Sequence, residues 1–327
     1  SVSSLRFNSK MFLQLNENEF GGLCPPASFR LSGELGLPLF NRDHGLRHPL
    51  GIYNVSLGKI EERFKKVLNE LEPFLKVENA EQIKDNLFPP LLDAQERLLF
   101  SLEEHFDDCY SILDCFFPNT SVRKKNAQVK LFVKRMETYS DLIGEIVNKM
   151  KHKNARLRGI ILSLGTQVVP GYFLEGVHPD GALGPDLHIH KGSGGLTAFS
   201  FFRDLRLHFV SLFATSEYLT KAIDHLGDKG SSDARLTCSW AAELGKTLAS
   251  LPETYYPNEI KPRNPWILYN EEQDERIRLT LSIGEKSPKP KTFVHGPGIP
   301  SFAVRAIYSG DSVTKSFKIP YSGTVQA

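Results

Sequence analysis

Apolar residues at helical spacing mark most of the chain between positions 55 and 251. The clearest stripe starts at Val129 and continues in alternating steps of three and four residues to Met150. It predicts one long amphipathic helix, which we expect Gly165 and Pro170 to end. The same kind of pattern predicts four more helices: one from about Ser56, one after Pro89-Pro90, one over about 196–226 and one over about 232–250.

The pattern changes after Pro252, where apolar and polar residues alternate as they do in strands. Three segments show this alternation: 276–283, 302–308 and 313–319. Residues 171–195, by contrast, have the Gly, Pro and His content of a loop. We therefore predict a mainly α fold, with a helical-bundle body over 55–251, an irregular N-terminal segment over 1–54 packed on it, and a small β-rich C-terminal appendage over 252–327.

The composition is that of a globular protein, and the net charge limits the kinds of partner that we expect. The chain has 327 residues, of which 40% are hydrophobic and 24% are charged, so it has enough apolar material for a large core. A net charge of +2 implies neither nucleic acid nor an anionic membrane as a partner. No apolar stretch approaches the roughly 18 residues of a membrane span. A homo-oligomer is left open.

The four cysteines, Cys24, Cys109, Cys115 and Cys238, are widely spaced and form no CxxC pair. In a chain of this length they are typical of reduced, buried thiols. The first fifteen residues contain no apolar core of a signal peptide. We therefore predict a cytoplasmic protein.

A glycine-rich segment, Lys191 to Gly195 (KGSGG), precedes the predicted helix over 196–226. Glycines at the start of a helix let the backbone approach a ligand, and their N–H groups can bind an anion there. The helix carries, in order, Phe209-Val210, Leu212-Phe213, Ser216 and Tyr218-Leu219. This combination resembles the haem-binding core of the tryptophan and indoleamine dioxygenase superfamily, in which a glycine-rich loop closes over the haem and the substrate.

The resemblance extends to a histidine ahead of the loop. In that superfamily a helix carries the histidine that ligates the haem iron, with a basic residue six positions later, and His152 and Arg158 have this spacing. The resemblance therefore implies haem b as the cofactor and His152 as the ligand of its iron. Because His152 lies off the apolar stripe of its helix, an exposed position without a role is the alternative.

The resemblance also implies a small aromatic substrate, with O₂ or peroxide as the oxidant. Ser193, a catalytic candidate, and the backbone of Gly192, Gly194 and Gly195 would cover the substrate and the haem edge. The other expected substrate contacts are Thr197, the ring-bearing Phe199, Phe202 and Phe209, and Arg30 for a carboxylate. Arg30 follows a segment, Phe20 to Ser28, that is similar to the carboxylate-binding segment of the superfamily. The implied function is a haem-dependent oxygenase, a dioxygenase or a hydroxylase, that acts on an aromatic amino acid or an indole-like metabolite.

Two other groups of residues compete with this site. His105, a catalytic candidate, is four positions before Cys109; the HxxxC pair is similar to the one that attaches haem covalently in some aromatic hydroxylases, or it is a buried thiol beside a surface histidine. The loop 178–190 holds His178, Asp180, Asp186, His188 and His190. If the loop is extended, His188 and His190 point the same way, as ligands of zinc, iron or manganese.

Two alternative functions follow from these groups. One is a non-haem, metal-dependent hydrolase or oxygenase that uses the loop 178–190. The other is a non-catalytic helical protein whose β-rich tail docks a partner.

Overall fold

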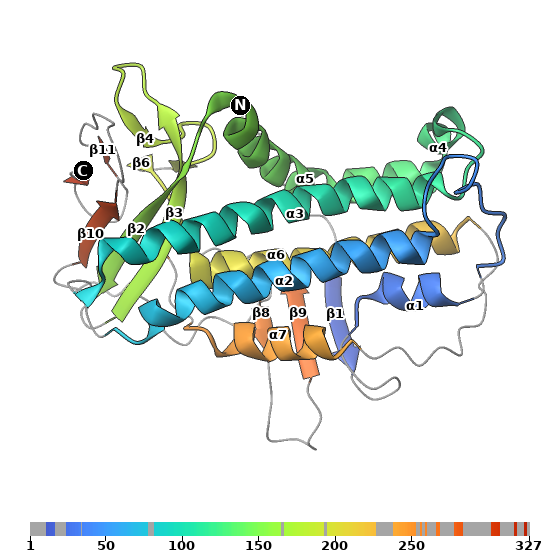
Figure 1. Ribbon diagram of the computed structural model, residues 1–327, viewed down its shortest axis with the longest axis horizontal. Coiled ribbons are helices and arrows are strands. Elements are labelled where there is room, and N and C mark those ends of the chain that lie inside the picture. Colours follow the sequence, from blue (N-terminus) through green and yellow to red (C-terminus); the bar gives the residue numbers. More distant parts are fainter. Residues whose placement is uncertain are drawn as a thin grey trace.

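The computed structural model is mainly helical and describes most of the chain (Figure 1). The described residues are 11–16, 24–33, 35–77, 82–164, 167–192, 195–226, 238–252, 256, 259, 266–268, 278–283, 302–307, 317–318 and 324–325. In this part of the chain, long helices form the body and an antiparallel sheet lies at one end of them. The predicted α class is therefore confirmed, together with a small β component.

Four long helices lie side by side along the long axis of the molecule (Figure 1). They are α2 (Pro49–Leu75), α3 (Phe88–Asp114), α5 (Ala127–Lys153) and α6 (Phe201–Asp224). Three shorter helices, α1 (Pro26–Ser32), α4 (Thr120–Lys125) and α7 (Ser239–Ser250), and a 3-10 turn, η2 (Asp85–Leu87), complete the described helical part. Helix α6 is buried on nearly all sides, which makes it the central helix of the body.

The apolar stripes predicted from the sequence face the shared core. The stripe of α5 is buried from Val129 through Phe132, Met136 and Ile143 to Ile146. The predicted start of α2 was wrong, because the helix begins at Pro49 and His48 accepts a hydrogen bond from the N–H of Leu50 at 3.3 Å. Ser56 consequently lies inside the helix, where it is buried.

A sheet interrupts the helices between α5 and α6, where we had expected the end of a helix and a loop. Its strand order is β10-β2-β3-β4, with the short β7 also paired to β3, and every pairing is antiparallel. The strands are β2 (Leu157–Leu164), β3 (Gln167–Val177), β4 (Leu183–Pro185), β7 (Phe199–Ser200) and β10 (Phe302–Ile307). The prediction of a helix up to Gly165 and Pro170 was therefore wrong.

The physical reason is local. Asn154 adopts a left-handed conformation, with φ at 53°, and ends α5 after Lys153. The next apolar run, 157–164, forms a strand whose Ile160, Ile161 and Leu162 are all buried. Side chains on both faces of this strand are therefore covered, so the run does not alternate, and its periodicity does not distinguish a strand from a helix.

The strands predicted near the C-terminus are confirmed where they are described. They correspond to β9 (Arg278–Ile283), β10 and β11 (Phe317–Lys318), whereas 313–316 lie outside the described residues. Strand β10 pairs with β2, so that Val304 lies opposite Leu162. The predicted boundary at 252 stays a prediction, although this ladder crosses it.

Short strands complete the described part of the chain. β1 (Met11–Asn16) and β8 (Trp266–Leu268) flank β9, and β11 pairs with β12 (Thr324–Val325). β5 (Lys191–Gly192) and β6 (Gly195–Leu196) form a two-stranded hairpin. The segment over 1–54, which we expected to be irregular, thus contributes β1, α1 and the first turn of α2.

The cysteines correct a second prediction. Cys24 and Cys238 form a disulfide that links the residues before α1 to the start of α7, whereas Cys109 and Cys115 are free and buried. The expectation that all four are reduced was wrong, because two cysteines 214 positions apart in the sequence meet in the fold. The cytoplasmic location stays a prediction, and the cysteines no longer support it.

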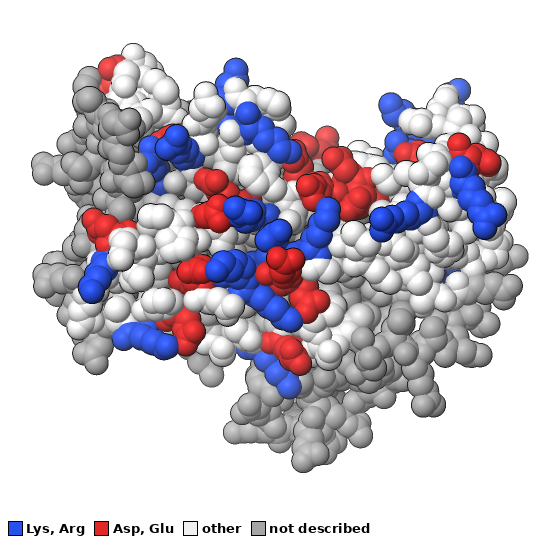
Figure 2. All heavy atoms as spheres, viewed as in Figure 1, with Lys and Arg blue, Asp and Glu red and all other residues white. Residues whose placement is uncertain are grey.

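The surface carries charges of both signs in close mixture. Figure 2 shows Lys and Arg side chains interleaved with Asp and Glu over the face of α2 and α3. Pairs such as Lys59 with Glu104 and Lys151 with Glu103 join neighbouring helices across this face. In the described residues, no helix is both long enough and apolar enough to cross a bilayer.

Candidate functional site

The glycine-rich segment forms a hairpin rather than the first turn of a helix. Lys191 pairs with Leu196 and Gly192 pairs with Gly195. Helix α6 begins only at Phe201, so these glycine N–H groups do not lie at a helix start, and that part of the prediction was wrong. Ser193 and Gly194, both predicted site residues, lie outside the described residues.

His190 directly precedes this hairpin and is completely buried, with 0% of its surface exposed. Its Nε2 accepts a hydrogen bond from the backbone N–H of Leu174 on β3 at 2.9 Å. Its Nδ1 has no hydrogen-bond partner among the described residues. Burial lowers the pKa of His190 to about 3, so the imidazole is neutral at physiological pH.

Aromatic rings contact the imidazole of His190. The ring of Phe199 lies 4.7 Å from that of His190 and 5.6 Å from that of Tyr172, measured between centroids. Phe173 approaches His190 from β3 with its ring perpendicular, at 6.4 Å. Thr197 donates hydrogen bonds to the carbonyl oxygen of His190 through its N–H, at 2.7 Å, and its hydroxyl, at 3.0 Å. Of the predicted substrate contacts, the structure therefore brings Thr197 and Phe199 together at the glycine hairpin.

The other predicted phenylalanines lie deeper in the helical body. Phe209 packs against Phe64 of α2 and Phe213 of its own helix, at centroid distances of 6.3 and 5.0 Å. Phe202 is buried in the first turn of α6. These two rings are core residues in the described structure.

A buried polar network lies behind Tyr172. The hydroxyl of Tyr172 donates to Oδ2 of Asp204, and Nε2 of Gln95 lies 3.1 Å from the same oxygen. Nε2 of His208 is 2.9 Å from that oxygen, and Nδ1 of His208 is 2.9 Å from the hydroxyl of Tyr139. Burial acts to raise the pKa of Asp204, but His208 and Tyr172 hold it below its usual value, so the carboxylate is ionised.

The sequence gives little signal for this network. Asp204 and His208 are four positions apart on one helix, which is the one spacing that sequence reasoning can use. Their partners Gln95, Tyr139 and Tyr172 come from two other helices and a strand, so that only the fold brings them together.

A second buried carboxylate holds β7 in place. Glu259 accepts hydrogen bonds from the N–H of Ser200 at 2.9 Å, from the hydroxyl of Ser200 at 2.5 Å and from the N–H of Tyr256 at 2.9 Å. Ser200 is the N-cap of α6, so Glu259 supplies the cap acceptor from a distant segment. Burial raises the pKa of Glu259 to about 7. Because Ser200 adjoins Phe199, this contact helps to fix the ring of Phe199 next to His190.

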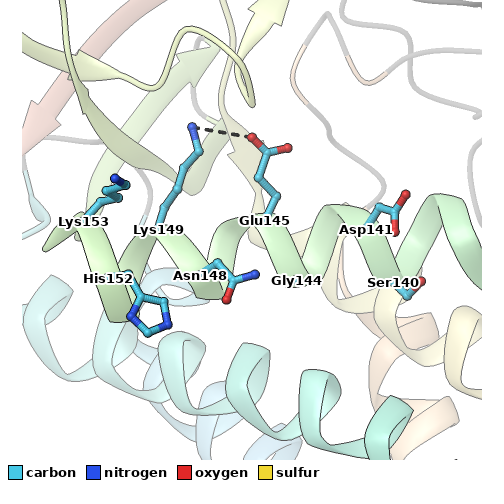
Figure 3. A pocket seen from close by; sticks show the side chains of 8 residues that line it. All are labelled: Ser140, Asp141, Gly144, Glu145, Asn148, Lys149, His152 and Lys153. Atoms are coloured by element: carbon cyan, nitrogen blue, oxygen red, sulfur yellow. Dashed lines mark ion pairs between the residues drawn. The ribbon is translucent and has the colours of Figure 1, made fainter. Parts of the chain in front are cut away.

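The predicted haem ligand lies on the surface. His152 is exposed in the last turn of α5, where it lines an open hollow of about 640 Å³ (Figure 3). The hollow is bordered only by polar residues and one glycine of α5: Ser140, Asp141, Gly144, Glu145, Asn148, Lys149, His152 and Lys153. A porphyrin needs a largely apolar, enclosed slot, so the residues around His152 do not fit haem. His152 as iron ligand stays a prediction that this position does not support.

Two of the other predicted site residues have structural partners. Arg158 is buried in β2, where its Nη2 lies 2.7 Å from Oε2 of Glu175 on β3. Arg30 holds Asp224 at the end of α6, with Nε 2.5 Å from Oδ1. In this state the charge of each arginine is already balanced by a carboxylate.

His105 is buried rather than exposed, which corrects the picture of a surface histidine beside Cys109. Its Nδ1 lies 2.8 Å from the hydroxyl of Ser56, and its Nε2 lies 3.7 Å from the sulfur of Cys109. Burial lowers the pKa of His105 to about 4. Both ring nitrogens therefore face protein groups within the core.

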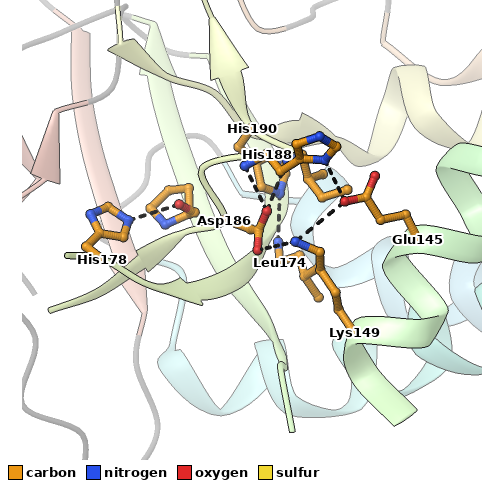
Figure 4. Close-up of polar contacts among 9 residues, drawn as sticks. Glu145, Lys149, Leu174, His178, Asp186, His188 and His190 are labelled. Atoms are coloured by element: carbon orange, nitrogen blue, oxygen red, sulfur yellow. Dashed lines mark hydrogen bonds and ion pairs between the residues drawn. The ribbon is translucent and has the colours of Figure 1, made fainter. Parts of the chain in front are cut away.

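The histidine-rich loop does not gather metal ligands. His188 is exposed and pairs with Glu145, at 2.6 Å, whereas His190 is buried, so the expectation that they point the same way was wrong (Figure 4). The reason is a turn at 187–190, in which Oδ1 of Asp186 accepts the N–H groups of His188 and Ile189. His178 is turned to the carbonyl oxygen of Pro185, at 3.0 Å. Within the described residues, no three such side chains form a group suited to a metal ion.

Comparison with known proteins gives no family for this chain. No protein-family model matches it. A search of curated proteins and a search of solved structures also found no match. The resemblance to the tryptophan and indoleamine dioxygenase superfamily accordingly stays a prediction, and the site is argued from its own geometry.

Proposed function

We propose that this protein binds a small aromatic molecule beneath the glycine hairpin, next to Phe199 and His190. One observation carries the proposal: directly before a hairpin with two paired glycines lies a buried, neutral histidine whose ring contacts those of Phe173 and Phe199. Glycines let a ligand approach the backbone closely. Aromatic rings at this spacing favour stacking or edge contacts with another flat ring.

The proposed oxidation of that molecule is a separate step. A haem-dependent oxygenase requires an imidazole whose lone pair faces the iron. His152 is exposed, and the ring nitrogens of the buried His105 face Ser56 and Cys109. Neither His152 nor His105 therefore fits a haem ligand in the described structure, and we derive no chemical step through haem. Haem-dependent oxidation stays the expectation of the resemblance, and a Soret band in the absorption spectrum of the purified protein is its test.

The binding proposal is tested with a matched pair of ring deletions. Phe199→Leu removes the ring at the glycine hairpin, and Phe132→Leu removes a comparable ring that contacts Tyr110 at 6.0 Å in the helical body. We expect calorimetric titration with 3-methylindole and indole-3-acetate to show binding by the wild type and by Phe132→Leu. Phe199→Leu should weaken binding by about two- to tenfold, because an aromatic pair contributes roughly 0.5–1.5 kcal/mol beyond its area.

Two results would contradict the proposal. One is a wild-type protein that binds neither probe. The other is an equal affinity for the probes in the two variants, which would move the binding site away from the glycine hairpin.

A further inference from the structure

We infer that one end of the helical body, made by α4 and the first turns of α5, binds the surface of an anionic phospholipid membrane. The segment between Asp114 and Glu137 contains six basic residues and no acidic one. The net charge of +2 for the whole chain conceals this concentration, because the compensating carboxylates lie elsewhere in the sequence. The inference does not depend on the aromatic binding site proposed above.

Most of these basic side chains are available to a partner. One of the six, Arg123, is held by Asp114, with Nε 2.6 Å from Oδ1. The other five are exposed and form no ion pair within the described part of the chain: Lys124, Lys125, Lys130, Lys134 and Arg135. Like charges gathered on neighbouring turns create a local positive potential, which attracts an anionic surface.

The fold adds positive charge from a second segment at the same end of the molecule. Helix α4 projects from the end of the body at which α3 ends and α5 begins (Figure 1). The loop before α2 is fastened there, with Nε2 of His44 2.8 Å from the carbonyl oxygen of Phe117. This loop contributes two exposed arginines and one exposed carboxylate: Arg42, Arg47 and Asp43.

Exposed aliphatic side chains lie among these cations, and they favour a membrane over other polyanions. Val122, Leu131 and Val133 are 45%, 39% and 39% exposed. On α5, Leu131 is three positions before Lys134 and Val133 is three positions after Lys130, so apolar and basic side chains are neighbours on the helix surface. Surfaces that bind membranes combine basic side chains for the lipid phosphates with apolar ones that enter the boundary between headgroups and acyl chains. Contacts to a nucleic-acid backbone use the charges alone.

The core of the protein does not compete for this face of α5. The residues of the same turns that face the body are buried: Val129, Phe132 and Met136. The outer face can therefore meet a membrane surface while the helix stays in the bundle.

The test measures binding of the full chain to lipid vesicles by co-sedimentation. We expect the wild type to bind phosphatidylcholine vesicles that contain about 30 mol% phosphatidylserine at about 0.1 M salt, and to bind pure phosphatidylcholine at least about tenfold more weakly. Lys124→Gln combined with Lys125→Gln should weaken binding to the anionic vesicles by roughly 10- to 30-fold, since each lysine near such a surface contributes about fivefold. Failure of the wild type to bind the anionic vesicles, or equal binding to both kinds of vesicle, overturns the inference.

A matched control removes the same charge from the opposite end of the body. Lys84 precedes α3 and Lys153 is the last residue of α5, and both are exposed. Lys84→Gln combined with Lys153→Gln should bind the anionic vesicles within about twofold of the wild type, because charges far from the contact are screened. An equal loss in the two charge variants would place the binding surface elsewhere and overturn the inference.

A third variant distinguishes a membrane from another polyanion. Leu131→Gln combined with Val133→Thr keeps every charge and should weaken vesicle binding by roughly 3- to 10-fold, because less apolar surface enters the lipid. Unchanged vesicle binding in this variant contradicts the membrane contact. Binding of a short DNA duplex by a wild type that does not bind vesicles would identify nucleic acid as the partner instead.

A salt series on the wild type alone covers the case in which a variant does not fold. Raising the salt from about 0.1 M to about 1 M shortens the screening length from about 10 Å to about 3 Å, so binding to the anionic vesicles should weaken by at least about tenfold. Binding that is insensitive to salt overturns the inference.

Discussion

At the residue scale, the environment of Glu259 changes its pKa in a way that can be tested. Its carboxyl group lies in the core and accepts hydrogen bonds from Ser200 and Tyr256. These contacts favour the ionised form, but burial outweighs them and raises the pKa of Glu259 from 4.5 to about 7. The protonated form is therefore the one that folding favours.

This gives a pH dependence with a defined sign. Between pH 4.5 and about 7 the folded state binds a proton that the unfolded state releases, so the free energy of unfolding falls as the pH rises through this window and levels off above it. Glu259→Gln, which cannot ionise, should remove this decline, at most about 3 kcal/mol of stability. Urea unfolding at pH 5 and pH 8 measures it. Glu243→Gln, on the exposed face of α7, is the control and should keep the wild-type slope; an equal slope in Glu259→Gln would refute the assignment.

Residues of this kind are the ones that sequence reasoning missed. Glu259 and Ser200 are 59 positions apart, and the contact between His190 and Leu174 spans 16 positions. No periodicity or short motif encodes such pairs, because each depends on which strand lies next to which. The glycine segment and Phe199 were found because glycines and aromatic residues are informative as residue types, without knowledge of their partners.

At the element scale, the long helices and the strand β10 could be predicted, but the strands β2 and β3 at the centre of its sheet could not. Between Val129 and Ile146, the residues of α5 alternate between a buried face and an exposed face, and this alternation has the helical period. Strand β2 has no exposed face to alternate with, since Phe88 of α3 packs directly against it at Gly159. A methyl group on Gly159 would lie 2.2 Å from the Phe88 ring, so this glycine serves close packing rather than a turn.

The disulfide is the element-scale feature that is most directly tested. Cys24 and Cys238 tie the start of α1 to the start of α7 across 214 positions. Replacing both with Ser should lower the free energy of unfolding by about 2–4 kcal/mol, because a long loop is no longer closed in the unfolded chain. Denaturant unfolding with and without reductant measures this. The double variant should not respond to reductant, which is its internal control.

Thiol titration gives an independent check of the same pairing. Unfolded protein that has never met reductant should show the two free thiols of Cys109 and Cys115, and reduction should add those of Cys24 and Cys238. Four reactive thiols before reduction would contradict the disulfide and restore the interpretation that all the cysteines are reduced.

At the scale of the whole molecule, the candidate site lies where the sheet meets the helical body. The glycine hairpin is followed along the chain by β7, which pairs with β3, and α6 begins immediately after β7 (Figure 1). The polar network of Asp204, His208 and Tyr139 then leads from this end into the core. The charges of both signs on the surface of α2 and α3 are interleaved, so they do not mark a binding site there (Figure 2).

The resemblance pointed to the segment in which we propose the binding site. It drew attention to the glycines and to Thr197 and Phe199, which do meet His190. It also selected His152, because its spacing to Arg158 fits a motif. His152 is exposed on α5, however, whereas Arg158 is buried in β2 and pairs with Glu175. Spacing along the chain does not report whether a side chain is buried, and α5 ends between these two residues.

The central claim is that a small aromatic molecule binds at the glycine hairpin next to Phe199, and a crystal structure of the full chain with indole-3-acetate tests it most directly. We predict the indole ring beside the ring of Phe199, with centroids about 4.5–7 Å apart, as aromatic pairs prefer. The hydrogen bond from the N–H of Leu174 to Nε2 of His190 should persist in the complex. A ligand bound elsewhere would contradict the account.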